Sequence, residues 1–246
     1  MNILLTVAYD GTNYAGWQRQ DNAISVQQRL EEALSELLSK NIKVSSASRT
    51  DAGVHALGQR SAFKVDHMPI PLEKLPLAVN SRLPKDIVVH AALTVDENFS
   101  PRFDAHSKTY SYQIYNAPYP DPMLSRYSAF VPQKLNTEKM AQAAKNFVGT
   151  FDFAAFCATG SSAKTTERTI FSCGVEKKGQ LIRLTVTGNG FLYNMVRIIA
   201  GTIVYAGMGK LSNIPEIILS KDRTKAGKTM PPEGLTLEEV RYEEEL

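Results

Sequence analysis

The chain has 246 residues, enough for one large domain or two small ones. Its hydrophobic content of 43% and charged content of 22% are typical of a folded soluble protein and exclude a disordered or fibrous chain. The formal net charge is only +3, but residues 237–246 hold five acids against one base, which leaves 27 bases and 20 acids in the rest of the chain. That basic balance is compatible with a polyanionic partner and equally with an ordinary solvated surface.

Metal and membrane functions are disfavoured by the same sequence. The only cysteines, Cys157 and Cys173, form no CxxC pair, so we expect reduced thiols in a cytoplasm. The histidines are scattered and form no metal-binding motif, so no metal is expected. The apolar stretch 191–209 is interrupted by Asn194, Arg197 and Gly201, which favours a buried helix with one functional face over a membrane span.

Hydrophobic spacing predicts the elements of the first half. In chain order these are a strand over 3–9, a helix over 26–38, strands over 44–47 and 60–65, a helix over 71–83 and a strand over 87–95. Ser25 is placed to cap the first helix. The polar, glycine-containing stretch 48–58 connects the second and third strands.

A similar order begins again after a polar link over 98–106. The pattern predicts a strand over 109–115, a helix over 137–147, strands over 170–176 and 181–187, helices over 192–205 and 213–219, and a final strand over 236–242. The expected fold is therefore α/β (α+β), with two β-α-β-β-α-β halves of the ferredoxin-like or RRM-like kind, residues 1–105 and 106–246. We expect mainly antiparallel sheets that meet at a central catalytic cleft.

The connection in the first half carries the main candidate for chemistry. The segment Ser48–Ala56 places one carboxylate, Asp51, among a cation, a hydroxyl and a glycine that permits a tight turn. Asp51 there could serve only as an Asx-turn residue that bonds nearby backbone amides, or it could be a catalytic carboxylate. Spacing alone leaves both readings open.

Five stretches, in order along nearly the whole chain, resemble the tRNA pseudouridine synthase A family. They are Ser48-Arg49-Thr50-Asp51-Ala52-Gly53-Val54-His55-Ala56, Tyr9-Asp10-Gly11-Thr12 with Gly16-Trp17-Gln18, Lys108–Tyr112, Phe151–Phe153, and Gly190–Arg197 with Pro231–Leu235. The first departs from the family pattern only at Ser48, where glycine is usual.

The resemblance implies isomerisation of uridine to pseudouridine in the anticodon stem-loop of tRNA, at positions 38, 39 and 40, by a homodimer that needs no cofactor. Asp51 is implied as the catalytic nucleophile. Whether it attacks C1′, adds to C6 of the base or helps to remove a ribose proton stays open. The target nucleotide must be extruded to expose C1′ and C5.

An extruded base needs a stacking face and a cation. By the resemblance, Tyr110 lies against the target base and Arg49 contacts the flipped nucleotide, although Tyr112 and Tyr115 are equally good stacking residues on composition. Arg197 lies in an apolar stretch, where an unpaired guanidinium is costly, so we expect an anionic partner. The resemblance suggests Asp51, which the pair would keep ionised. The alternative is a structural ion pair with another acid.

Further basic residues are candidates for contact with the body of the tRNA. They include Arg19, His55, Arg102, Lys164, Arg168 and the run 221–228. A catalytically silent RNA-binding or RNA-folding protein is the main alternative, since split β-α-β units also bind RNA. A small-molecule sugar hydrolase fits poorly, because no second carboxylate accompanies Asp51 in its loop.

Overall fold

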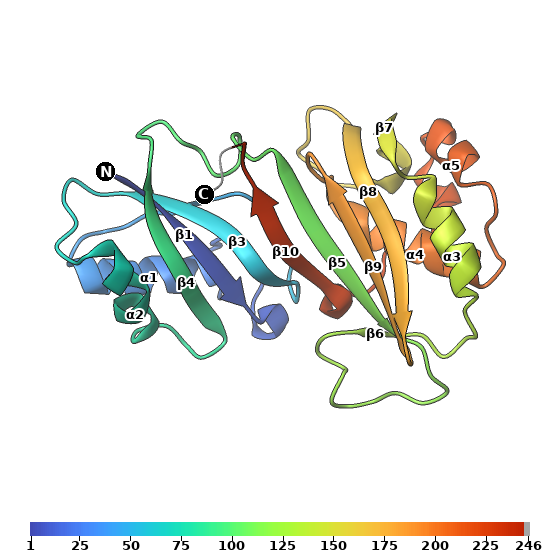
Figure 1. The fold of residues 1–246 in the computed structure, drawn as a ribbon, viewed down its shortest axis with the longest axis horizontal. Coiled ribbons are helices and arrows are strands. Elements are labelled where there is room, and N and C mark those ends of the chain that lie inside the picture. The colour runs from blue at the N-terminus through green and yellow to red at the C-terminus, as the bar shows by residue number, and fades with distance from the viewer. Residues whose placement is uncertain (244–246) are drawn as a thin grey trace. The chain divides into compact units, whose positions relative to one another are not determined.

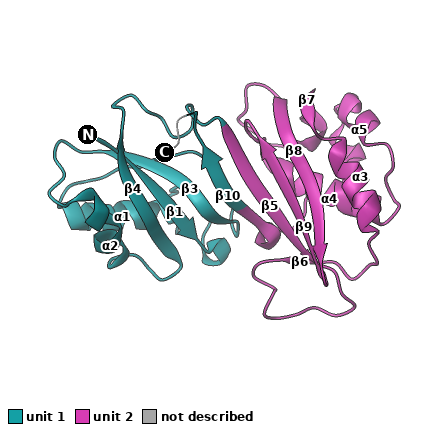
Figure 2. Ribbon diagram, in the orientation of Figure 1, with its two compact units in different colours: residues 1–106, 237–246 teal, residues 107–236 magenta. Residues whose placement is uncertain are grey.

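The structure, a computed structural model, describes residues 1–243. The chain divides into two units (Figure 2). Unit 1 comprises Met1–His106 together with the segment that begins at Leu237, and unit 2 comprises Ser107–Thr236. The sequence analysis instead predicted halves over 1–105 and 106–246, with the last strand in the second half.

Unit 1 contains the predicted order β-α-β-β-α-β. Its elements are β1 (Asn2–Tyr9), α1 (Val26–Leu38), β2 (Ser45–Ser46), β3 (His55–Lys64), α2 (Leu75–Asn80) and β4 (Ile87–Val95). Most of β10 (Leu235–Arg241) also belongs to it. In Figure 1, α1 runs behind the strands β1 and β4.

The sheet of unit 1 is antiparallel around β1. The strand order is β4-β1-β3, with β2 paired to β3 and β10 beside β3. Asn2 of β1 lies opposite Lys64 of β3 and opposite Val95 of β4. The β1–β3 register shifts between Val7 and Tyr9. This shift lies near the start of β3, directly after the loop that carries Asp51. The strand order β4-β1-β3-β2 is that of the predicted ferredoxin-like unit.

Helix α1 has the predicted bounds because its determinants are local. The Ser25 hydroxyl accepts a hydrogen bond from the Gln28 amide at 3.2 Å, and the side chains of Val26, Leu30 and Leu34 are buried at helical spacing. By contrast, α2 is shorter than the predicted helix over 71–83. A 3₁₀ turn precedes it, and it ends at Asn80, whose side-chain amide bonds both backbone groups of Val89 in β4.

The final strand is joined to unit 1 by several contacts. The Tyr242 hydroxyl donates to the Pro101 carbonyl at 3.0 Å, and its ring lies 5.0 Å from that of Phe99. Gly58 of β3 approaches the backbone of β10 so closely that a Cβ there would lie 2.4 Å from the Glu238 oxygen. These contacts explain why the segment from Leu237 is grouped with the first unit.

The strands of unit 2 are mainly antiparallel and follow the order β5-β9-β8-β7, with β6 parallel to β5. Its elements are β5 (Ser107–Tyr115), β6 (Ala129–Phe130), α3 (Thr137–Lys145), β7 (Gly149–Asp152), β8 (Glu167–Lys178), β9 (Leu181–Gly188), α4 (Met195–Gly207) and α5 (Ile214–Ser220). The sequence analysis did not predict β6 and β7. Helix α3 packs against β8 and α4.

Helix α4 accounts for the apolar stretch near the end of the chain. It starts at Met195, three residues later than predicted, because Asn194 has a left-handed backbone (φ 59). Almost all of its residues are buried, and no helix within residues 1–243 has the length and apolar character that a bilayer crossing requires. A Cβ on Gly201 would lie 1.9 Å from the Lys228 oxygen, so residue 201 must be glycine for this close approach.

Candidate functional site

Asp51 lies in the connection between β2 and β3 of unit 1, on a tight turn. The Val54 amide donates to the Asp51 carbonyl at 3.1 Å, which closes the turn. Gly53 occupies its third position with φ 75, a left-handed value that favours glycine there. A backbone hydrogen bond and a left-handed glycine thus define this turn, and the Asp51 side chain on it is half-buried.

The residues on either side of Asp51 are tied to the segment that follows β1. The Thr50 hydroxyl lies 2.7 Å from the Tyr9 hydroxyl in a buried hydrogen bond. The Thr50 carbonyl accepts from the Trp17 amide at 3.0 Å, and the Gly53 amide donates to the Tyr14 carbonyl at 3.3 Å. The loop is thus held by hydrogen bonds before and after its carboxylate, and these fix its path.

Two glycines of that segment allow it to lie directly on the loop. A Cβ on Gly11 would be 1.9 Å from the Val54 oxygen, and one on Gly16 would be 2.6 Å from the Thr50 oxygen. Gly16 also has φ 92, which disfavours any side chain. The motifs Tyr9–Thr12 and Gly16–Gln18 therefore position the loop, a role that their spacing in the sequence does not reveal.

Ser48, which stands where the resembling family usually has glycine, is clamped by a buried glutamine. The Gln59 side chain accepts from the Ser48 amide at 3.2 Å and donates to the Ser48 carbonyl at 2.7 Å. Among the described residues, Ser48 is not one of those with positive φ, so this position does not need the backbone freedom of glycine. Sequence reasoning missed Gln59 because a lone glutamine in a strand carries no distinctive signal.

His55 closes the base of the loop. The Gly11 amide donates to His55 Nδ1 at 3.1 Å, and Asp10 Oδ1 lies 3.2 Å from the same nitrogen. The side chain is only 4% exposed. This burial favours a role in holding the loop against the β1 segment over direct contact with RNA.

In unit 2, Arg197 lies in the first turn of α4. Its Nε donates to the Met230 carbonyl at 2.7 Å and its Nη1 to Asn194 Oδ1 at 2.6 Å. The left-handed Asn194 thus serves both as the start of the helix and as an acceptor three residues before the arginine. The guanidinium is half-buried and held by two neutral oxygens, so its direction is fixed.

Tyr110 lies in β5, opposite Val186 of β9. Its ring makes an edge-to-face contact with Phe191 at 5.2 Å between centroids, and the residue is 7% exposed. Tyr112, an alternative on composition, is fully buried and donates its hydroxyl to the Pro231 carbonyl at 2.6 Å. Tyr115 donates to Gln180 Oε1 at 3.0 Å. Tyr112 is thus buried more completely than Tyr110, and its hydroxyl is bound to the backbone.

The remaining basic candidates are spread over both units. Arg49 and Lys164 are exposed, and Arg102 stacks on the Phe103 ring at 5.6 Å. Arg168 donates to the carbonyls of Thr165 and Glu167. Arg19 pairs with the buried Glu31. Within residues 1–243, no group of three or more His, Cys, Asp or Glu side chains could hold a metal ion.

Comparison with known proteins agrees with the class that these motifs indicate. The sequence model of a family described as tRNA pseudouridine synthase matches residues 5–104 and 143–243. The chain belongs to this family of RNA-modifying enzymes.

The curated relatives carry a more specific name than the family. Proteins named tRNA pseudouridine synthase A from Caldicellulosiruptor saccharolyticus and Ruminiclostridium cellulolyticum are 47% and 49% identical, each over 98% of this chain and 99% of the relative. One from Thermoanaerobacter pseudethanolicus is 46% identical with the same coverage. A crystal structure of a Cbf5–Nop10–Gar1 complex matches with a TM-score of 0.40 at 12% identity, over 95% of this chain and 57% of that chain. The family assignment rests on the sequence matches alone.

Proposed function

We propose that this protein isomerises uridine to pseudouridine in the anticodon stem-loop of tRNA, with Asp51 as the nucleophile. The observation that carries the proposal is the loop itself, which carries a single carboxylate, Asp51, and is anchored on both sides of it by the hydrogen bonds of Thr50 and Gly53 and by glycine contacts. Family membership and relatives named tRNA pseudouridine synthase A support the reaction and its substrate class.

A single carboxylate suffices for this chemistry. The N1–C1′ bond breaks, the uracil turns and C5 joins C1′, while C5 loses a proton and N1 gains one. Breaking a glycosidic bond creates positive character at C1′, which a carboxylate can stabilise or trap. No water is added, so the second acid that a glycosidase needs for its nucleophilic water has no counterpart here. No cofactor enters the scheme.

We assign the remaining roles by chemistry. A uridine can react only when it is extruded, at a cost of a few kcal/mol. Tyr110 of β5, whose ring packs edge-to-face on Phe191, is proposed to stack on the extruded base, and the exposed Arg49 to contact its phosphate. Arg197 is proposed as a catalytic cation, since Asn194 and Met230 hold its guanidinium in one direction.

We also propose a homodimer in the cytoplasm. An extended tRNA needs more basic surface than one small chain with a net charge of +3 offers. The oligomeric state is measured by light scattering of the full chain, where the proposal predicts twice the monomer mass.

Tritium release from tRNA labelled at C5 of uridine tests the reaction directly. Asp51→Asn is expected to abolish release while it leaves tRNA affinity within about threefold, because one neutral isostere changes few backbone contacts. Asp21→Asn, the same change at an exposed acid of unit 1, is the matched control and should release tritium at the normal rate.

Two results would contradict the proposal. Normal release by the Asp51→Asn variant would remove Asp51 from the mechanism. Tight tRNA binding without any release by the unaltered protein would favour the alternative, a non-catalytic RNA-binding protein. Pseudouridine-specific sequencing of tRNA from cells without the protein then identifies the modified positions.

A further inference from the structure

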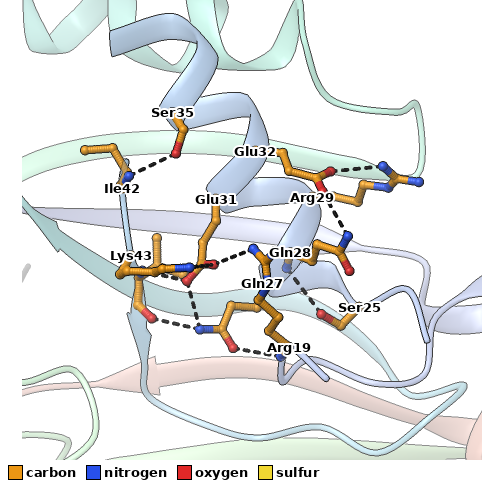
Figure 3. A network of polar contacts seen from close by, with 11 residues as sticks. Arg19, Ser25, Gln27, Gln28, Arg29, Glu31, Glu32, Ser35, Ile42 and Lys43 are labelled. Atoms are coloured by element: carbon orange, nitrogen blue, oxygen red, sulfur yellow. Dashed lines mark hydrogen bonds and ion pairs between the residues drawn. The ribbon is translucent and has the colours of Figure 1, made fainter. Parts of the chain in front are cut away.

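A buried carboxylate in unit 1 holds two exposed cations side by side. Figure 3 shows Glu31 of α1 with Arg19 and Lys43 on either side of it. Arg19 Nη1 and Lys43 Nζ lie 3.1 and 3.3 Å from the same oxygen, Glu31 Oε2. The Glu31 side chain is 3% exposed, whereas those of Arg19 and Lys43 are 44% and 63% exposed. The carboxylate is therefore buried, whereas the two cations face solvent.

The other oxygen of Glu31 is fixed by the fold. Glu31 Oε1 accepts from the Gln27 side chain and from the Val44 amide, both at 3.2 Å. Gln27 in turn accepts from the Arg19 amide at 2.9 Å and donates to the Val44 carbonyl at 3.0 Å. Backbone and side chain of Arg19 are thus both anchored to α1, and the segment of Lys43 and Val44 is anchored to the same helix turn.

The charges do not cancel in this cluster. Glu31 neutralises one of its two cations, and the nearby Glu32 is already paired with Arg29 at 3.0 Å. A surplus positive charge therefore remains on donors that face solvent. A guanidinium and an ammonium held together match the geometry of a phosphate, which has several acceptor oxygens.

The cluster is connected to the candidate catalytic loop from two directions. Two residues before Arg19, the Trp17 amide donates to the Thr50 carbonyl, next to Asp51. Lys43 directly precedes the stretch through β2 that leads into the same loop. The two cations are thus positioned by the segments that position Asp51.

We propose that Arg19 and Lys43 form a joint binding site for a phosphate of the tRNA backbone, and that Glu31 orients them. The proposal rests on the proposed function and adds a phosphate subsite and a positioning residue to it. Such a site would fix the register of the RNA relative to Asp51 without reading its sequence.

Single variants of the two cations test the site. Arg19→Gln and Lys43→Gln are each expected to weaken tRNA binding about tenfold, the size expected for one charge-assisted hydrogen bond. Each should also lower the slope of log K against log salt concentration by about 1. Arg29→Gln is the matched control: it removes a cation of α1, the helix of Glu31, that is already paired with Glu32. It should change tRNA affinity less than twofold.

Glu31→Gln distinguishes orientation of the two cations by Glu31 from undirected electrostatic attraction of the tRNA, because the two explanations predict opposite changes in tRNA affinity. The change raises the net charge by one, so undirected attraction would tighten tRNA binding. If Glu31 orients the cations, binding weakens despite the added charge. Circular dichroism verifies that the Glu31→Gln variant is folded. If it is not, Arg19→Gln and Lys43→Gln decide the test, because both side chains are exposed and their replacement should not disturb folding.

Unchanged affinity and salt slope in Arg19→Gln and Lys43→Gln would overturn the proposal, as would tighter binding by a folded Glu31→Gln variant. Those results would leave tritium release by the unaltered protein intact. Failure of the proposed function itself would appear instead as an absence of release from the unaltered protein.

Discussion

Replacing Gly16 by alanine tests whether the contact between the β1 segment and the loop positions Asp51. The new Cβ would lie 2.6 Å from the Thr50 oxygen, closer than real Cβ atoms come, and 3.0 Å from the Asp51 carbonyl carbon, which is a tight contact. Adopting φ 92 with a side chain costs about 1–2 kcal/mol. Relieving the overlap costs about 1–3 kcal/mol more.

Gly160→Ala is the matched control. Gly160 has φ 86, close to that of Gly16, but nothing lies within 4 Å of its Cβ position. It should lose only the backbone cost of about 1–2 kcal/mol and keep its activity. The difference between the two variants in the free energy of unfolding therefore reports the overlap with the Asp51 loop.

Activity gives the sharper readout. The overlap can be relieved only by moving the backbone of Thr50 and Asp51 or the segment of Gly16, and a displacement of about 1 Å at a catalytic group costs on the order of 100-fold in rate. Single-turnover tritium release at a temperature where both variants are folded measures this loss. A normal rate for Gly16→Ala, with Gly160→Ala also normal, would refute the reasoning.

Three further changes probe other contacts. Gln59→Leu leaves the amide and carbonyl of Ser48 without their buried partner and should destabilise the protein by about 2–4 kcal/mol in urea unfolding. Gln59→Glu should destabilise it as well, because it puts a buried carboxylate oxygen where the Ser48 carbonyl needs a donor. Asn194→Gly keeps the left-handed start of α4 but removes one acceptor of Arg197, the Asn194 side chain, so tritium release should slow while stability changes little. Asn194→Ala should cost about 1–2 kcal/mol more in stability, because alanine must adopt the left-handed backbone. Burial raises the pKa of the Cys173 thiol to about 12, so at pH 8 iodoacetamide should alkylate Cys157 but not Cys173 in the folded protein, and both in denaturant. The Cys173 thiol loses its proton at a higher pH in the folded protein than in the unfolded chain, so the free energy of unfolding should fall as pH rises from about 9 toward 12. Replacement of Cys173 by valine should remove this pH dependence.

Local signals account for the elements that were predicted well. The bounds of α1 follow from Ser25 and the helical spacing of Val26, Leu30 and Leu34, all within one segment. Strand β4 was likewise predicted over its observed length, from its own run of apolar residues. In contrast, β6 and β7 are two and four residues long and exist through pairing with distant strands, which no local pattern encodes.

The candidate site likewise combines features that a local motif predicts with features that depend on distant segments. The loop of Asp51 stood out because it matches a family motif residue by residue. Gly11, Gly16 and Gln59 were not recognised as its supports, because their effect depends on approaches between segments that are far apart in the sequence. The spacing of Asn194 and Arg197, three residues apart at a helix start, is one contact that the sequence could have revealed.

The return of the chain to unit 1 through β10 has a consequence for biosynthesis. Because β10 lies beside β3, the first unit is completed only after the 130 residues of Ser107–Thr236 have been made. Until then a nascent chain on the ribosome displays part of the β3 edge, where Gly58 later meets Glu238, as an open template for another strand. Early termination near residue 236 is therefore expected to yield an aggregation-prone product and not a smaller working protein.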